Sequence, residues 1–113
     1  MVSLSSRIDV SAPAVYYDDR FKMMIEQHLT ALIAHKGNTY LKVTPLDMEV
    51  WQGNLYGYLY SEQVPVFQHW LIMRMNGMDS TLDFDGDFTN LILPDIEQIN
   101  RLRDLFNTVH RIV

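Results

Sequence analysis

Two short apolar segments decide the fold: Thr39-Tyr-Leu-Lys-Val-Thr44 and Thr89-Asn-Leu-Ile-Leu93. In the first segment Leu41 and Val43 alternate with polar residues, and a proline follows each segment directly. Short runs of this kind, bounded by helix-breaking and strand-breaking residues, predict β-strands. A two-stranded sheet is only marginally stable alone. The remaining sequence must therefore supply helices that pack against it.

Between these two strands the sequence predicts two short helices. Residues 47–60 contain several large apolar side chains, and their two glycines weaken a helix without forbidding it. Pro65 suits the first turn of a second helix that runs to about Met75. Asn76-Gly77 would end that helix. The expected order is therefore strand, helix, helix, strand.

A longer amphipathic helix is predicted on each side of this unit. Residues 17–36 repeat apolar side chains at spacings of three and four, with acidic residues at the start and basic ones at the end, as the helix dipole favours. Residues 95–112 show the same spacing, with Asp95 as the expected N-cap. The expected fold class is α+β, with a two-stranded antiparallel sheet and two flanking helices.

The length and composition predict one soluble domain with an N-terminal arm. A chain of 113 residues fits a single core, which we assign to residues 17–113, while residues 1–16 are expected to form an extended arm. Hydrophobic residues make up 48% and charged residues 20%. No apolar run is long enough to span a bilayer, and the N-terminus has no signal-peptide pattern. We therefore expect no membrane partner and a protein that stays where it is made.

Charge and cysteine content exclude or disfavour several functions. The chain has no cysteine, which excludes disulfides, cysteine-ligated metals and thiol catalysis. Its formal net charge is −5 and it has no cluster of basic residues, whereas nucleic-acid binding depends largely on phosphate neutralisation. A nucleic acid partner is therefore not expected.

The acidic loop Asp83-Phe-Asp85-Gly-Asp87 is the first candidate for a metal site. An EF-hand counted from Asp83 needs glycine at its sixth place and glutamate at its twelfth, but these places hold Phe88 and Pro94. We expect a solvated turn in which Gly86 supplies a positive φ angle, while a looser calcium site stays open as an alternative. Asp87 would be part of the same turn.

The other patterns of enzymes and metal sites are missing. His28 and His35 are seven residues apart, whereas two ligands on one helix face stand four apart. There is no Gly-x-Ser-x-Gly elbow and no phosphate-binding glycine loop. A carboxylate pair for glycoside hydrolysis remains possible among 14 acidic residues. We expect a protein that is not an enzyme and that has no metal or cofactor.

The aromatic residues are the strongest candidates for a binding surface. A small core cannot bury all of them, and aromatic residues are enriched in protein interfaces. The alternative is that they are ordinary, partly exposed side chains of a single chain. The interface candidates are Tyr16, Tyr17, Tyr56, Tyr58, Tyr60, Phe84 and Phe88.

Residues 41–94 resemble a LysM-like unit in the order of their elements and in several residues. The similarity includes the first strand with its turn, and the apolar pair and the Tyr-Gly of the first helix. It also includes the Asn that ends the second helix and the family's final Leu-x-x-Gly, Leu-x-Ile-Pro pattern. The residues that carry it are Leu41, Val43, Leu46, Asp47, Trp51, Leu55, Tyr56, Gly57, Trp70, Met73, Asn76, Leu82, Gly86, Leu91, Ile92 and Pro94.

The ending Leu93-Pro94-Asp95-Ile96 is similar to the small LysM-like proteins of phage tails, including tail protein X and baseplate wedge subunits. This resemblance implies a structural subunit that is made in the host cytoplasm, built into a virion, and bound to other subunits of the tail or baseplate. A peptidoglycan- or chitin-binding LysM module is the first alternative. Leu46 stands where that family has a turn glycine, which favours assembly over sugar binding. A small acidic inhibitor of a nucleic-acid-binding enzyme is the second alternative.

Overall fold

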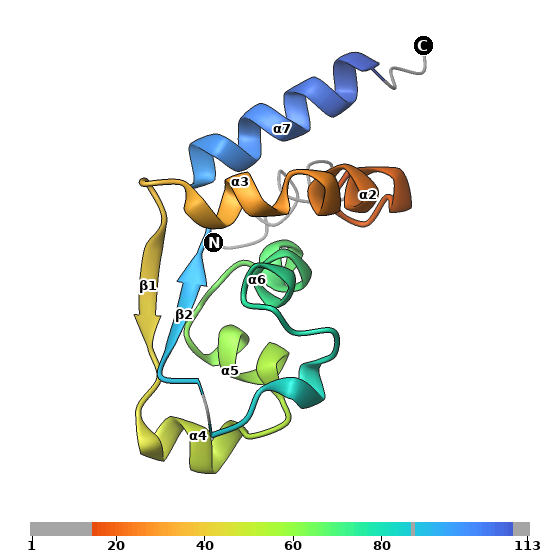
Figure 1. The fold of residues 1–113 in the computed structure, drawn as a ribbon. Helices are drawn as coiled ribbons and strands as arrows, with labels where there is room; N and C mark the ends of the chain where they lie inside the picture. The colour runs from red at the N-terminus through yellow and green to blue at the C-terminus, as the bar shows by residue number, and fades with distance from the viewer. Residues whose placement is uncertain (1–14, 87, 110–113) are drawn as a thin grey trace, which may run out of the picture.

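The computed structural model describes residues 15–86 and 88–109 and has the α+β architecture expected (Figure 1). Residues 1–14, most of the arm expected at the N-terminus, lie outside the described residues. Short 3₁₀ turns occur at Val66–Gln68 and Thr81–Asp83. The helices and strands are α2 (Asp19–Gln27), α3 (Leu29–Ala34), β1 (Thr39–Lys42), α4 (Pro45–Trp51), α5 (Leu55–Ser61), α6 (His69–Met75), β2 (Asn90–Leu93) and α7 (Ile96–Val109).

The two predicted strands pair in an antiparallel sheet. Thr39 lies opposite Leu93, and Lys42 lies opposite Asn90. The first strand is shorter than the predicted 39–44 segment because Thr44 caps α4: its Oγ1 accepts a hydrogen bond from Asp47 N at 3.1 Å, and Asp47 Oδ2 accepts one from Thr44 N at 3.0 Å. This reciprocal capping box turns the chain from strand to helix.

The prediction of one helix over residues 17–36 is wrong, because the helix is interrupted at His28. The His28 backbone N–H is shared between the carbonyls of Met24 and Ile25, and its ring Nδ1 lies 2.8 Å from the Met24 carbonyl. The second helix, α3, then ends at Ala34. Here the Asn38 side chain donates to the carbonyls of Leu32 at 2.7 Å and Ile33 at 3.1 Å and so caps the C-terminal end of the helix.

The prediction of a single helix within residues 47–60 is also wrong, because this stretch forms two helices, α4 and α5. Together with α6, three α-helices therefore connect the strands instead of two. Gly53 adopts a positive φ of 77°, and its N–H donates to the Phe84 carbonyl at 2.8 Å. Asn54 then starts α5, its Oδ1 accepting from Gly57 N at 3.1 Å. A glycine in a left-handed conformation followed by a capping asparagine separates the two helices.

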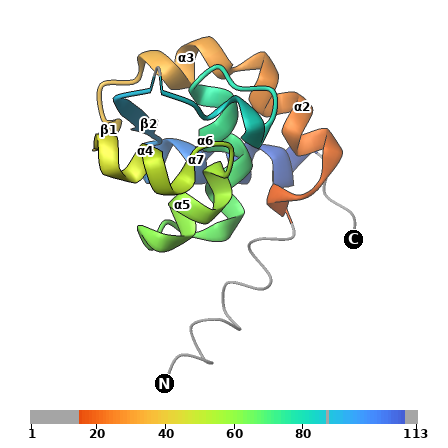
Figure 2. The same cartoon turned by 90° about the horizontal axis from the view of Figure 1, so that it is seen from below.

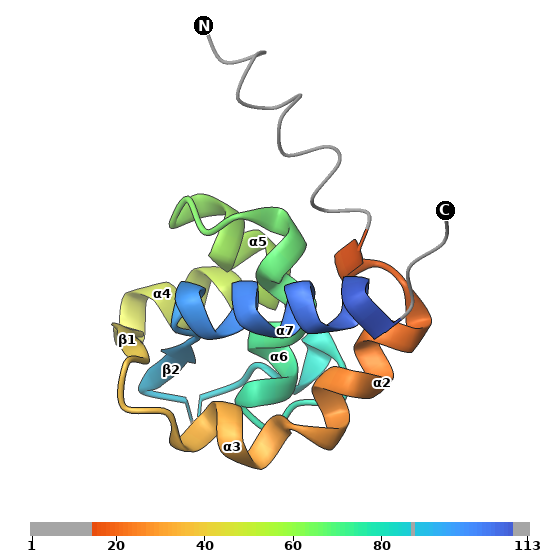
Figure 3. The ribbon, with the colours of Figure 1, turned by 90° about the horizontal axis from the view of Figure 1, so that it is seen from above.

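The third of these helices, α6, lies at the centre of the molecule. Views from below and from above place it between the α2–α3 pair and α5 (Figures 2 and 3). In the first view α2, α3 and α7 form one end of the molecule, and α4 the other (Figure 1). The α6 helix therefore joins two groups of elements, each with its own set of buried side chains.

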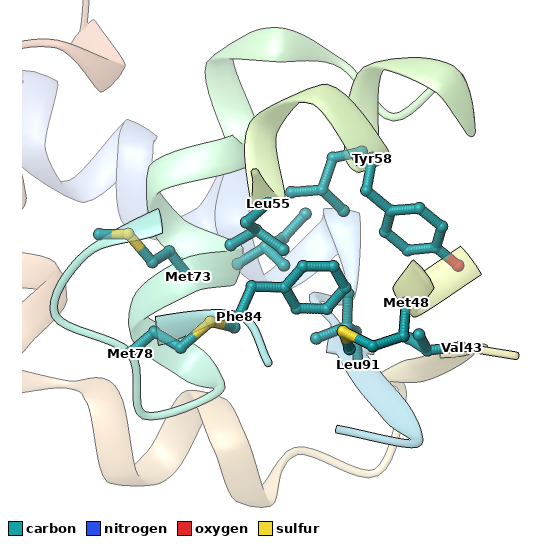
Figure 4. Close-up of a cluster of buried hydrophobic side chains, with 10 residues drawn as sticks. Val43, Met48, Leu55, Tyr58, Met73, Met78, Phe84 and Leu91 are labelled. Carbon is teal, nitrogen blue, oxygen red and sulfur yellow. The ribbon is translucent and has the colours of Figure 1, made fainter. Parts of the chain in front are cut away.

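The core consists of two apolar clusters that meet at the partly buried Trp70. One lies between the sheet and α4, α5 and α6, with the Phe84 ring among Met48, Leu55 and Leu91 (Figure 4). The other joins α2, α3, α6 and α7. Its buried members are Tyr16, Phe21, Ile25, Leu32, Leu71, Met75, Ile99, Leu102 and Phe106.

Candidate functional site

Three of the seven predicted interface residues are part of the core, so the expectation that they face a partner is wrong. Tyr58 and Phe84 are 1% and 0% exposed, and their rings stack with centroids 5.5 Å apart. Tyr16 is 5% exposed, and its ring lies 4.7 Å from that of Phe67. Tyr16 therefore belongs to the folded domain, which begins before the predicted boundary at residue 17.

The Tyr58 hydroxyl has a structural role at the junction of β1 and α4. It donates to the Lys42 carbonyl at 3.2 Å and lies 3.4 Å from Asp47 Oδ2. Burial, together with the nearby Asp47 carboxylate, raises the pKa of Tyr58 to about 12. The side chain therefore remains protonated at neutral pH, and its single O–H can donate to the Lys42 carbonyl.

The other four predicted interface residues remain accessible to different degrees. Tyr60 is 71% exposed and Tyr17 is 54% exposed, whereas Tyr56 is 36% exposed and Phe88 is half-buried. Tyr17 and Tyr56 come from distant parts of the sequence but line the same pocket, which has a volume of ≈ 220 Å³. Its other lining residues are Lys22, Val66, Phe67, His69 and Trp70.

Most side chains of this pocket are aromatic, and one is a cation. Lys22 Nζ lies 5.2 Å from the centroid of the Trp70 ring, within the range of a cation–π interaction. The rings of Tyr56 and His69 have centroids 5.5 Å apart, and the Tyr56 hydroxyl lies 3.9 Å from Met73 Sδ. Burial, followed by the proximity of Tyr17, raises the Tyr56 pKa. The pocket thus presents flat apolar faces.

His69 forms the polar part of the pocket wall without being available for acid–base work. Its Nε2 lies 2.9 Å from the Val64 carbonyl, and the side chain is 4% exposed. Burial lowers the His69 pKa, opposed by this backbone hydrogen bond. A neutral imidazole that donates from Nε2 to Val64 fits both observations.

A second, more open pocket adjoins the first at Val66. It has a volume of ≈ 540 Å³, and Tyr60, the most exposed of the predicted aromatic residues, forms one wall. We call the two pockets together the aromatic groove. Besides the first pocket's lining, it includes Tyr60, Ser61, Gln63, Val64 and Pro65. Sequence reasoning missed Lys22 and Val66, although Val66 follows the predicted helix start at Pro65.

A third pocket lies between the loops at the α4 end of the sheet. Its volume is ≈ 280 Å³. Thr44, in the loop after β1, and Pro45, the first residue of α4, line one side, while the loop before β2 contributes Gly86, Phe88 and Thr89. Val43 and Met48 complete the lining. Phe88 is therefore separated from the tyrosines of the aromatic groove.

The acidic loop forms a turn, but not with the expected glycine geometry. Asp83 Oδ2 accepts hydrogen bonds from the backbone N–H groups of Asp79 and Ser80 at 2.9 and 3.2 Å. Phe88 N donates to the Asp85 carbonyl at 3.1 Å. The expected positive φ of Gly86 is wrong: among the glycines of the described ranges, Gly53 and Gly77 have a positive φ.

Within residues 15–86 and 88–109, no three metal-ligating side chains come together. His28 caps the end of α2, whereas His35 Nδ1 lies 3.4 Å from Asp95 Oδ2. Across the same described ranges, no helix has both the length and the apolar character to cross a membrane.

The fold and surface together define a small α+β domain that carries an aromatic groove. Comparison with protein-family models, with curated proteins and with solved structures gave no match.

Proposed function

We propose that this chain is a structural subunit of a larger protein assembly, acting through protein–protein contacts and without an enzymatic reaction. The observation that carries the proposal is the aromatic groove, where Tyr17, Tyr56 and Tyr60 remain accessible and two pockets meet at Val66. Tyrosine and tryptophan at well-packed pockets dominate the binding energy of many protein interfaces.

The charge of the groove supports a protein partner. Lys22, held over the Trp70 ring, is its one cationic side chain among mostly apolar neighbours. A surface with a large apolar area and few charges resembles the centre of an interface more than a solvated face. Binding there would bury the exposed tyrosine rings and stabilise the complex through the hydrophobic effect.

We further propose that the assembly is a bacteriophage tail or baseplate. The support is the LysM-like sequence pattern of residues 41–94 and the Leu93-Pro94-Asp95-Ile96 ending. The helices α2, α3 and α7 lie outside this stretch, as in phage proteins that add helices to one LysM-like unit. The location that follows is the virion.

The test is to purify phage particles whose genome encodes this chain and to search their tails for it by mass spectrometry and immunolabelled electron microscopy. We expect the chain at a fixed number of copies per tail. Replacing Tyr60 with Ser should lower its incorporation about tenfold, the effect of losing one strong interface anchor.

The matched control is Tyr40→Ser. Tyr40 is 66% exposed, close to the 71% of Tyr60, but it lies on β1 and not in the groove. Incorporation of this variant should equal that of the unmodified chain. A chain that is abundant in the infected cell but absent from purified tails would contradict the phage proposal.

A second candidate function is glycan binding at the third pocket, favoured by the meeting of the loops after β1 and before β2 around Phe88. Aromatic and apolar faces can pack on sugar rings. Isothermal titration with N-acetylglucosamine oligomers tests this candidate, with Phe88→Ala expected to abolish the heat and Tyr60→Ser to preserve it. No saturable heat with the unmodified chain would exclude it.

A further inference from the structure

The aromatic groove begins where the described chain begins. Tyr17 lines the groove, and the preceding Tyr16 packs against Phe67, another lining residue. The Val15 carbonyl accepts a hydrogen bond from Asp18 N at 3.1 Å, which fixes the start of the domain. Residues 1–14 are therefore attached at one edge of the groove.

The sequence of residues 1–14 is amphipathic with a period of two. Val2, Leu4, Ile8 and Val10 occupy even positions, whereas the odd positions carry mainly serine and charged residues. In an extended chain, successive side chains point to opposite sides, so these four apolar residues share one face. Such a face has affinity for an apolar groove.

We propose that residues 1–14 of one copy of this chain bind in the aromatic groove of a second copy. This inference rests on the proposed function, because it names the partner of the groove as a neighbouring identical subunit. Fourteen extended residues reach about 46–50 Å, enough to extend beyond their own subunit. Val2, Leu4, Ile8 and Val10 would pack against the groove's tyrosines, with Asp9 available to Lys22.

The sequence next to the attachment point favours a second copy over the segment's own groove. Pro13 restricts Ala12 to extended conformations, and residues 1–15 contain no glycine. Both features disfavour a tight turn between this segment and the groove of its own subunit. Arms bound in neighbouring grooves can be exchanged reciprocally in a closed dimer or can link copies head to tail in a ring or an open chain.

The experiment measures the mass of the full chain by light scattering over a range of concentrations. We expect a mass above the 13.2 kDa of one chain, rising with concentration. The arm variant Leu4→Ser with Ile8→Ser, and the groove variant Val66→Asp, should each weaken association by tenfold or more. Val66 is 53% exposed in a 3₁₀ turn, so the groove variant should fold, which circular dichroism checks.

The matched control is Val50→Asp, which adds the same charge at a 61% exposed valine on α4, outside the groove. It should associate like the unmodified chain. The decisive measurement mixes the arm variant, whose groove is intact, with the groove variant, whose arm is intact. The mixture should form a 1:1 complex at concentrations at which each variant alone is monomeric.

The inference is overturned if the full chain is monomeric at all concentrations, if the arm variant associates normally, or if the mixture forms no complex. Any of these results leaves the phage proposal standing when the chain is still found in purified tails. Conversely, the chain could associate with itself through arm and groove and still be absent from purified tails. That result would support this inference and contradict the phage proposal.

Discussion

The side-chain amide of Asn76 makes both backbone hydrogen bonds of Ile92. Its Oδ1 accepts from Ile92 N at 2.8 Å, and its Nδ2 donates to the Ile92 carbonyl at 3.1 Å. The same Nδ2 lies 2.7 Å from the Ile72 carbonyl near the end of α6. One asparagine therefore ends a helix and occupies the open edge of β2, where another strand would otherwise pair.

Replacing Asn76 with Ala should lower the free energy of unfolding by about 2–3 kcal/mol, because the Ile92 N–H and carbonyl lose their partners in a partly buried position. Urea denaturation at pH 7 measures the change. The control is Asn107→Ala on the exposed face of α7, which should change stability by less than about 0.5 kcal/mol. Equal effects of the two substitutions would show that the Asn76 bonds contribute nothing.

Tyr58→Phe should destabilise the protein by about 1 kcal/mol at neutral pH, through loss of the hydrogen bond to Lys42. The folded pKa of Tyr58 is about 12, against 10.0 for a free tyrosine. The stability gained from this shift is complete below pH 10 and is lost as the pH rises to about 12.

Absorbance at 295 nm over an alkaline titration measures this group directly. The unmodified chain should show a tyrosine step near pH 12 that Tyr58→Phe removes. Tyr40→Phe, at a 66% exposed position, should retain that step. If Tyr58→Phe leaves the step near pH 12 unchanged, a different tyrosine is responsible for it.

Acid should destabilise the protein partly through His69. Because burial lowers its folded pKa, the unfolded chain binds a proton more readily. The stability it contributes is therefore present above pH 6.5, the ordinary histidine value, and is lost as the pH falls below it. His69→Gln retains an amide donor for the Val64 carbonyl but cannot become charged. Urea denaturation at pH 7.5 and pH 5 should show a smaller acid loss in this variant than in the unmodified chain.

Gly37→Ala should destabilise the junction of α3 and β1. A Cβ at this position would collide with the Asp95 side chain, which lies 3.4 Å from His35 Nδ1. We expect a fall of about 1–3 kcal/mol in the free energy of unfolding, the usual cost of overpacking. Gly86→Ala, where a Cβ meets nothing within 4 Å, is the control and should be nearly neutral in thermal denaturation.

The fold class and the strand positions could be predicted from sequence because they depend on local patterns. Alternation at Leu41 and Val43, and the period of three and four in residues 95–112, are visible without tertiary contacts. The helix interruptions could not be predicted. The one at His28 depends on which carbonyls its N–H and ring contact, and the one at Gly53 on a hydrogen bond to the distant Phe84.

The candidate site was predicted only in part. Aromatic composition indicated a binding surface but could not separate Tyr60 from Tyr58, two residues away on the same short helix, which are 71% and 1% exposed. Residues two apart on a helix face different directions, and which direction meets the core depends on how α5 packs. Nor could sequence place Tyr17 beside Tyr56, because they are brought together only by packing across α6.

The sequence by itself determined a cysteine-free, acidic α+β chain with two strands, amphipathic flanking helices and more aromatic residues than one small core would bury. These properties follow from composition and from periodicity along the chain. Only the tertiary structure decided that Tyr16, Tyr58 and Phe84 are core residues and that Tyr17, Tyr56 and Tyr60 border one groove. The physical reason is that burial depends on which elements pack on each face, and those contacts join residues far apart in sequence.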